Sequence, residues 1–255
     1  MPSIKGQSIL IIGGSSGIGF AVAQLALEQG VRAAIASSNS TRISAAVSNL
    51  KSAFPSLSDQ ITGHQCDLSS PEIEDRLLKL FKAVTDDGQK LLDHVIYTAI
   101  PPITLHPLDS LNPAAIQASS QFHLIAPLLI AKLAPSFLNP GYRSSLIFTS
   151  GQIADKPMAG WSLPAALGSG LFGMTRGLAL DLAPRRVNCV SPGATITELW
   201  GPKEMRENRA ETMKEMMLLG KVGMPEEVAE AYIYLMRNWN STGSIVSTNG
   251  GSLLK

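Results

Sequence analysis

Short, almost entirely apolar segments alternate along the chain with longer segments whose apolar residues recur at helical spacing. Ser8-Ile9-Leu10-Ile11-Ile12 is the first of the short ones, and such strands are expected where both faces of a sheet are buried. Strands that alternate with helices predict a parallel sheet covered on both sides. The predicted strands are 8–12, 32–36, 61–65, 93–98, 144–149, 185–190 and 244–247.

The intervening segments predict helices. The first runs through Phe20-Ala21-Val22-Ala23-Gln24-Leu25-Ala26-Leu27 and stops at Gly30, and the last begins at Pro225-Glu226-Glu227, where proline and acids favour a helix N-terminus. No linker, repeat or low-complexity segment interrupts the pattern. Residues 1–255 are therefore expected to form one α/β domain, a doubly wound, Rossmann-like parallel sheet. The predicted helices are 18–29, 40–53, 71–85, 113–137, 162–182, 203–218 and 225–237.

Composition and net charge limit the kinds of molecule that the chain is expected to bind. With 255 residues and 45% hydrophobic content the chain can bury one large core, and its net charge of +1 attracts neither nucleic acid nor anionic lipid. Cys66 and Cys189 lack the spacing of metal ligands and predict reduced thiols in a cytoplasmic protein without a metal. The apolar stretch 122–138 contains His123 and Lys132, so we do not expect it to span a membrane.

The first loop has a cofactor-binding pattern. Gly13-Gly14-Ser15-Ser16-Gly17-Ile18-Gly19 lies directly between a strand and a helix, the arrangement that places a pyrophosphate on a helix N-terminus. Gly17 and Gly19 have no Cβ, so the backbone can approach the phosphates and the sheet closely. A glycine pattern alone would also fit a tight turn with a helix cap, but its position between strand and helix favours a dinucleotide site.

The end of the second strand indicates which dinucleotide is bound. NAD-specific sites usually carry a carboxylate there, whereas this chain has no acidic residue between Glu28 and Asp59. It offers hydroxyl, amide and guanidinium groups that suit a 2′-phosphate, although a polar loop could lack acids by chance. The residues concerned are Ser37, Ser38, Asn39 and Arg42. We therefore predict NADP(H).

Together with later segments, these motifs make the chain resemble the short-chain dehydrogenase/reductase family over nearly its whole length. The resemblance implies an adenine contact at Asp67 and Leu68, and a strand leading to the Pro192-Gly193 turn beside the nicotinamide. Further cofactor contacts implied in the same way are Ala99, Thr195 and Thr197. Two C-terminal segments, 220–229 and 248–251, also match the family.

The resemblance fails at the catalytic positions. No tyrosine is followed four residues later by lysine, because Tyr97, Tyr142, Tyr232 and Tyr234 are followed there by Pro101, Leu146, Met236 and Asn238. Alignment of the family's long helix places its tyrosine on Pro164 and its lysine on Gly168. The family's serine then falls on Gly151 and its asparagine on His123, and its Asn-Asn-Ala-Gly stretch becomes 97–100. Proton transfer from tyrosine to a ketone oxygen is therefore not expected.

Few polar side chains remain to replace the lost ones. Asp155 follows the fifth strand, Trp161 precedes the long helix and could stack on a flat substrate, and His123 can titrate near neutral pH. Ser150 is a weaker candidate. Each also has a structural explanation, since Asp155 would suit a solvated loop, His123 a hydrogen-bonded core position and Trp161 simple packing.

Residues 195–222 occupy the segment that covers the substrate in this family. Methionine is adaptable, so a methionine-rich lid would suit a bulky apolar small molecule, although the same residues could pack a helix on the core. Gly201-Pro202 would separate the lid from the sheet. The methionines are Met205, Met213, Met216, Met217 and Met224.

Three functional hypotheses follow. In the first, NADPH reduces a pre-activated electrophile such as an imine or iminium, as in the fungal secondary-metabolite reductases of this family, some of which also guide a cyclisation in indole-alkaloid pathways. In the second, the cofactor is structural and the pocket catalyses a non-redox cyclisation or isomerisation. In the third, the chain is a non-enzymatic NADP(H)-binding partner subunit. The resemblance also implies a homo-oligomer, a dimer or tetramer.

Overall fold

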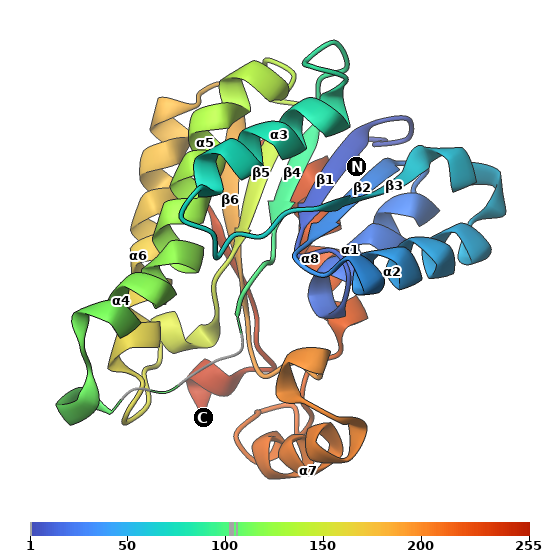
Figure 1. The fold of residues 1–255 in the computed structure, drawn as a ribbon. Coiled ribbons are helices and arrows are strands. Elements are labelled where there is room, and N and C mark those ends of the chain that lie inside the picture. The colour runs from blue at the N-terminus through green and yellow to red at the C-terminus, as the bar shows by residue number, and fades with distance from the viewer. Residues whose placement is uncertain (1, 102–104, 106) are drawn as a thin grey trace.

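Seven parallel strands form one sheet in the computed structural model, which describes residues 2–101, 105 and 107–255 (Figure 1). Their order across the sheet is β3-β2-β1-β4-β5-β6-β7. The strands are β1 (Ser8–Ile12), β2 (Arg32–Ser37), β3 (Ile61–Gln65), β4 (His94–Tyr97), β5 (Ser145–Thr149), β6 (Arg186–Pro192) and β7 (Ile245–Thr248). The predicted doubly wound α/β fold is confirmed, and each predicted strand lies within two residues of its observed bounds.

Helices cover both faces of the sheet (Figure 1). Leu10 and Ile12 of β1 point into the core shared with α3, α5 and α6, whereas Ile9 and Ile11 point into the core shared with α1, α2 and α8. Alternate side chains of one strand thus enter opposite cores, which is why the strand is apolar throughout. The helices are α1 (Gly17–Glu28), α2 (Ser40–Ala53), α3 (Ile73–Thr85), α4 (Pro113–Ser120), α5 (Ala126–Phe137), α6 (Ser162–Asp181), α7 (Lys203–Lys214) and α8 (Pro225–Arg237).

The predicted helix 113–137 contains an interruption. A π-helical turn, η3 (Gln121–Ile125), separates α4 from α5. The Tyr97 hydroxyl donates to the Phe122 carbonyl at 2.7 Å, and the Gln121 side chain donates to the Leu68 carbonyl at 3.0 Å. The strand ends therefore hold the helix at its irregular turn, and π-turns of this kind are frequent at functional sites.

By length and composition alone, Pro113–Phe137 is the one helical run among the described residues that could cross a membrane, with a mean hydropathy of 1.3. Core helices of soluble proteins meet the same criterion. Here Ile130, Ala134 and Phe137 are buried in the core beside α3. Packing in a core therefore accounts for the apolar residues on the buried face of α5, whereas only 22% of the apolar window of the whole run is buried in the isolated chain.

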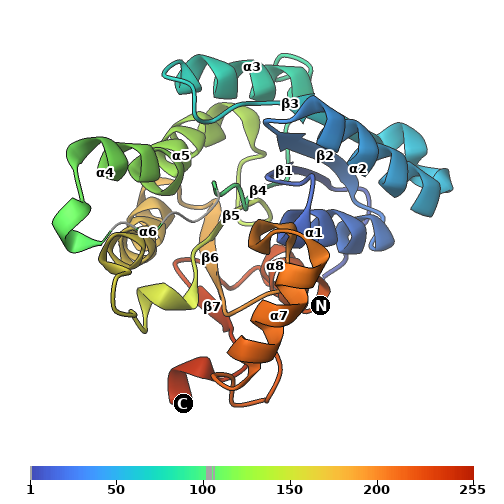
Figure 2. The ribbon, with the colours of Figure 1, turned by 60° about the horizontal axis from the view of Figure 1, so that its bottom comes forward.

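The strand order reverses direction between β1 and β4. The chain first winds outward through β2 and β3, then returns to place β4 on the other side of β1. In sheets of this kind, ligands bind in the crevice outside the carboxyl ends of the strands at this reversal. The helix α7 and the segment that follows β5 lie beyond the carboxyl ends of the strands, on opposite sides of them (Figure 2). We therefore expect the predicted site residues at the carboxyl ends of the strands, between α7 and that segment.

Candidate cofactor and substrate site

The glycine-rich turn packs too closely for side chains. Gly13 and Gly17 adopt φ angles of +100° and +53°, in the region that favours glycine. A Cβ on Gly13 would lie 2.6 Å from the Ala99 nitrogen, and one on Gly19 would lie 2.4 Å from the Gly13 carbonyl oxygen. The Thr98 hydroxyl oxygen would be equally close to both added carbons, at 2.6 and 2.5 Å. The turn is therefore pressed against the end of β4, and the N-terminus of α1 faces the crevice.

The lid segment closes on the other side of this turn. A Cβ on Gly17 would lie 3.1 Å from Thr197 Cγ2 and 3.6 Å from a carboxylate oxygen of Glu198. Thr195 and Thr197 are both buried. The Gly223 amide donates to the Ala194 carbonyl at 2.8 Å, and the Ile196 amide donates to the Gly223 carbonyl at 3.0 Å, which fixes the start of the segment. Two predicted cofactor regions, 13–19 and 195–197, thus lie side by side.

The adenosine end of the predicted site lies at β2 and β3. Asn39 caps α2 by accepting the Arg42 amide at 2.8 Å, so its side-chain oxygen is already used, whereas the Arg42 side chain is exposed. Ser37 is half-buried and Ser38 is exposed beside them. The side chain and amide of Ser69 donate to the Asp67 carboxylate, and these bonds hold the pKa of that carboxyl below its usual range. Asp67 is therefore an anionic acceptor.

Leu68 and the Pro192-Gly193 turn, two further predicted cofactor positions, are each held by hydrogen bonds of their backbone. The Leu68 side chain is buried, and its carbonyl accepts a bond from Gln121. A Cβ on Gly193 would lie 2.6 Å from Asn249 Cα, and the Gly193 amide donates to the Thr248 carbonyl at 2.9 Å. This turn therefore brings β6 and β7 together at the carboxyl edge.

The cradle made by these residues fits a nicotinamide dinucleotide. A bare backbone turn at a helix N-terminus suits the pyrophosphate, and the exposed guanidinium of Arg42 suits additional negative charge at the ribose. No cluster of three or more histidine, cysteine, aspartate or glutamate side chains able to hold a metal occurs within residues 2–101, 105 and 107–255.

Pro164 and Gly168 lie on the first turns of α6. A Cβ on Gly168 would lie 3.2 Å from both Ala154 Cβ and Ser150 Oγ. The Ser150 hydroxyl donates to the Gly168 carbonyl at 3.1 Å, and the Ser169 hydroxyl donates to the Ala154 carbonyl at 2.7 Å. The segment after β5 is therefore bonded to α6 where the resemblance placed a lysine, and the Ser150 hydroxyl proton is engaged in that contact.

His123 lies in the π-helical turn and is half-buried. Its Nδ1 lies 2.9 Å from the Ser119 carbonyl, so Nδ1 carries the proton that it donates. In the neutral ring Nε2 is then an acceptor, able to hold a water or a substrate N–H. The turn η3 packs against α6, as does the 3₁₀ turn η4 (Gln152–Ala154) that follows β5.

Asp155 and Trp161 frame the loop between η4 and α6. Asp155 is exposed, and Trp161 is half-buried at the N-cap of α6. The Lys156 ammonium donates to the Ser252 carbonyl at 3.0 Å, which ties this loop to the C-terminal turn. No hydrogen bond joins Asp155, His123, Trp161 and Ser150 directly to one another among the described contacts. Their shared catalytic role stays a prediction.

The predicted lid has a small core of its own. Met217 is buried with Ala194 and Val222, and Met213 packs on this cluster together with Trp200. The predicted helix 203–218 ends earlier, at Lys214, because the chain turns at Met216 and Met217 toward Gly220. Met205, Met216 and Met224 stay exposed.

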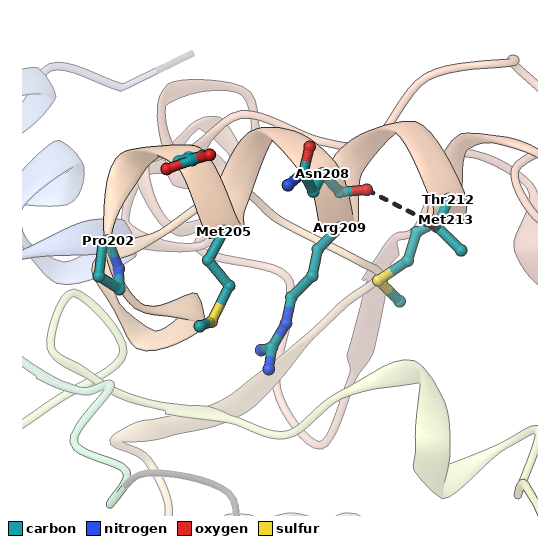
Figure 3. Close-up of a pocket in the computed structure, with 7 residues that line it drawn as sticks. Pro202, Met205, Asn208, Arg209, Thr212 and Met213 are labelled. Carbon is teal, nitrogen blue, oxygen red and sulfur yellow. Dashed lines mark hydrogen bonds between the residues drawn. The ribbon is translucent and has the colours of Figure 1, made fainter.

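A cavity of about 530 Å³ runs along α7 (Figure 3). It is lined by Pro202, Glu204, Met205, Asn208, Arg209, Thr212 and Met213. Two of these methionines, Met205 and Met213, line the cavity, and Met217 belongs to the small core. That the segment covers a substrate stays a prediction.

Sequence reasoning missed three side chains of this region. Thr98 packs on the glycine turn, and Glu198 lies beside it with Arg206 Nη1 at 3.9 Å from its carboxylate. Arg209 lines the lid cavity. The i, i+4 spacing of Met205, Arg209 and Met213 was a signal for the third, because it places them on one helical face.

Known proteins resemble the chain over its full length. The short-chain dehydrogenase/reductase ATR9 of Stachybotrys chlorohalonatus is 48% identical over all of both chains. The structure of the MalC reductase/Diels-Alderase from Malbranchea aurantiaca superimposes with a TM-score of 0.92 and 38% identity, covering 98% of this chain and 97% of that one.

A short-chain dehydrogenase from Burkholderia cenocepacia in complex with NADP superimposes with a TM-score of 0.84 and 25% identity, covering 98% of this chain and 99% of that one. Residues 3–255 match the family described as SDR-like Rossmann domain. Members of that family are oxidoreductases with a nicotinamide cofactor. The chain belongs to the short-chain dehydrogenase/reductase family.

Proposed function

We propose that the protein is an NADPH-dependent reductase of a pre-activated imine or iminium intermediate in secondary metabolism. The observation that carries this proposal is the absence of any Tyr-x-x-x-Lys pair, together with the bonded contact at Gly168 where the lysine would emerge. A ketone needs an acid to protonate its developing alkoxide. An iminium carbon accepts hydride without one, since the charge on nitrogen is neutralised in the step.

The bound cofactor supplies the hydride, and the residues of the chain supply position and charge. The glycine turn and Thr197 hold the dinucleotide, and Arg42 selects NADPH. Asp155 stabilises the cationic substrate, an effect that grows as the lid excludes water. His123 Nε2 accepts a substrate N–H or orders a water beside it.

A second reaction at the same site is a guided cyclisation. The MalC structure, 38% identical to this chain, is named a reductase/Diels-Alderase, which favours a pocket that also shapes a ring closure. A cyclisation without nicotinamide turnover, with NADP bound only structurally, is the alternative form of this proposal. The oxidoreductase family supports an enzyme over a non-enzymatic partner subunit.

The setting that we propose is cytoplasmic, with the chain as a homo-oligomer that has neither nucleic acid nor membrane as partner. Cys66 and Cys189 are buried free thiols, which suits a reducing compartment.

The first experiment compares two probes of matched shape, the cyclic imine dihydroisoquinoline and the ketone tetralone, by following NADPH oxidation. We expect measurable turnover of the imine and none of the ketone. Strong turnover of tetralone would mean that the catalytic helix has been aligned wrongly. Product formed from a pathway intermediate without NADPH consumption would favour the cyclisation instead.

Two variants test the proposed catalytic roles of His123 and Asp155. His123→Ala and Asp155→Ala should each lower kcat with dihydroisoquinoline at least severalfold and leave the affinity for NADPH nearly unchanged, because neither residue belongs to the cofactor cradle. Asp59→Ala, an exposed acid remote from the edge, is the control. Full turnover in both test variants would remove these residues from the reaction.

A further inference from the structure

Arg209 differs from the other three cations of the lid helix α7 in its charged neighbours. Lys203 lies 3.8 Å from Glu207, Arg206 lies 3.9 Å from Glu198, and Lys214 pairs with Glu211. Arg209 has no carboxylate within 4.0 Å and no side-chain hydrogen bond among the residues that the structure describes. Its guanidinium is exposed and lines the 530 Å³ cavity. Glu204 and Arg209 are the two charged side chains that line this cavity, and Arg209 is its one cation.

The face that carries Arg209 is fixed by the packing of its neighbours. Met213, one turn later, packs on the lid core of Ala194, Met217 and Val222 at the carboxyl end of β6. Met205, one turn earlier, also lines the cavity, and its sulfur would lie 3.0 Å from a Cβ on Gly201. Figure 3 shows the three side chains extending to the same side of α7. The helix therefore presents a guanidinium between two thioethers.

We propose that Arg209 binds an acceptor oxygen, a carbonyl or a carboxylate, on a bulky apolar substrate. This inference rests on the proposed function, since it names the substrate class of the same site. Planar guanidinium groups match such oxygens with two parallel donors, and methionine adapts to irregular apolar surfaces. The substrate therefore has an apolar body, a basic nitrogen at the reacting end and an acceptor oxygen at the lid end.

Opposite charges on the segment after β5 and on α7 support this arrangement of the substrate, with its nitrogen at one end and its oxygen at the other. Asp155 is exposed in the segment after β5, and α7 and that segment lie on opposite sides of the carboxyl ends of the strands (Figure 2). A substrate with a cationic nitrogen and an acceptor oxygen at opposite ends has one preferred orientation between an acid and a guanidinium. An apolar imine without the oxygen lacks that preference.

Three cyclic imines that share one ring system test the proposal: dihydro-β-carboline, its methyl ester and its free carboxylate. Their binding to the enzyme–NADP⁺ complex is measured by calorimetry, so that the result does not depend on turnover. We expect at least one of the two oxygen-bearing probes to bind about tenfold more tightly than the parent ring, and Arg209→Met to abolish the difference. Lys203→Met, on the same helix but outside the cavity, is the matched control and should preserve the difference.

A second variant distinguishes the two oxygens. Arg209→Gln keeps a donor but loses the charge, so it should retain the preference for the ester if the natural acceptor is a carbonyl. It should lose the preference for the carboxylate if the natural acceptor is an anion. Equal binding of all three probes by the wild type, binding of none, or a preference that survives Arg209→Met overturns the inference. An Arg209-dependent preference without NADPH oxidation by any probe leaves the inference intact and contradicts the proposed reductase instead.

Discussion

Arg42 is the side chain on which the choice of cofactor depends. It lies in the first turn of α2, where its amide is bonded to Asn39 and its guanidinium is exposed, and no acid occurs between Glu28 and Asp59 to bind a ribose hydroxyl. A charged contact to a 2′-phosphate contributes about 1.5–3 kcal/mol, equivalent to roughly tenfold or more in affinity. We therefore expect NADPH to bind much more tightly than NADH, and Arg42→Ala to remove that preference in calorimetry.

Lys51→Ala provides the comparison for this prediction, because Lys51 is an exposed cation in the last turn of the same helix. It should leave the preference for NADPH unchanged. Equal affinities of the wild type for the two cofactors would contradict the assignment of NADPH.

At the scale of elements, the C-terminus of α8 depends on a buried arginine. Arg186 of β6 is 2% exposed, and its guanidinium donates to the carbonyls of Leu235 at 2.6 Å, Met236 at 3.0 Å and Asn238 at 3.1 Å. Its Nε donates to the Tyr142 carbonyl at 2.6 Å. Burial lowers the pKa of this group to about 10, so it remains charged at neutral pH. Carbonyls that the helix leaves unpaired at its end are thereby satisfied.

Removal of this guanidinium should be costly. Arg186→Met leaves several buried carbonyls without a donor, at about 1–3 kcal/mol for each group that water cannot reach. We expect a loss of several kcal/mol in urea unfolding, or failure to fold. Arg186→Lys, with fewer donors, should still fold but with a clear loss of stability. Arg32→Met, at an exposed position of β2 whose side chain makes no hydrogen bond or ion pair among the described residues, should cost much less, and similar losses at 32 and 186 would refute this role.

An element can be predicted from the sequence when the residues that determine it are adjacent in the chain. The strands and the glycine turn follow from residues adjacent in the chain, and both are found where expected. The π-turn at 121–125 was not predicted, because the apolar spacing of 113–137 is continuous and its interruption involves Tyr97, far away in sequence. Arg209 was not predicted for the same reason. The sequence gives no sign that an arginine on an amphipathic helix differs from any other solvated cation, because its lack of a carboxylate partner depends on how the neighbouring side chains are placed.

For the molecule as a whole, the buried histidine of β4 links stability to pH. His94 is fully buried between Gln7, at 2.9 Å from Nε2, and Ser145, at 2.8 Å from Nδ1. Burial, with a smaller contribution from the charge of Arg186, lowers its pKa from 6.5 to about 3. The folded protein therefore holds this ring neutral at pH values where the unfolded chain protonates it.

The contribution of the neutral His94 ring to the free energy of unfolding is fully present above pH 6.5. It is lost progressively as the pH falls toward 3, where the folded state would also bind the proton. With each pKa unit equivalent to about 1.4 kcal/mol, the shift from 6.5 to about 3 corresponds to an effect on the order of 5 kcal/mol. His94→Asn should flatten the decline of unfolding free energy between pH 6.5 and 4, whatever its stability at neutral pH. His64→Asn, at a less buried site, should change the slope much less, and an unchanged slope in His94→Asn would contradict the linkage.

The exposed side of α6 bears on the assembly of the protein. Gly173 and Gly177 are exposed with no atom within 4 Å of an added Cβ, and Leu180 beside them is 81% exposed. In the isolated chain these glycines only weaken the helix, by roughly 0.5–1 kcal/mol each relative to alanine. Small residues on a helix face let a second helix approach closely, so we expect two copies of the chain to pair through α6.

Gly173→Arg tests this pairing. Arginine is a better helix former than glycine and meets open space here, so a single copy of the chain should fold at least as well as before. Between two closely packed helices, however, its bulk and charge should shift the protein toward the monomer, as measured by light scattering or sedimentation. Ser48→Arg, exposed on α2 away from this face, should leave the assembly unchanged. A wild type that is already monomeric, or a Gly173→Arg variant with the mass of the wild-type oligomer, would show that α6 is not the contact between copies.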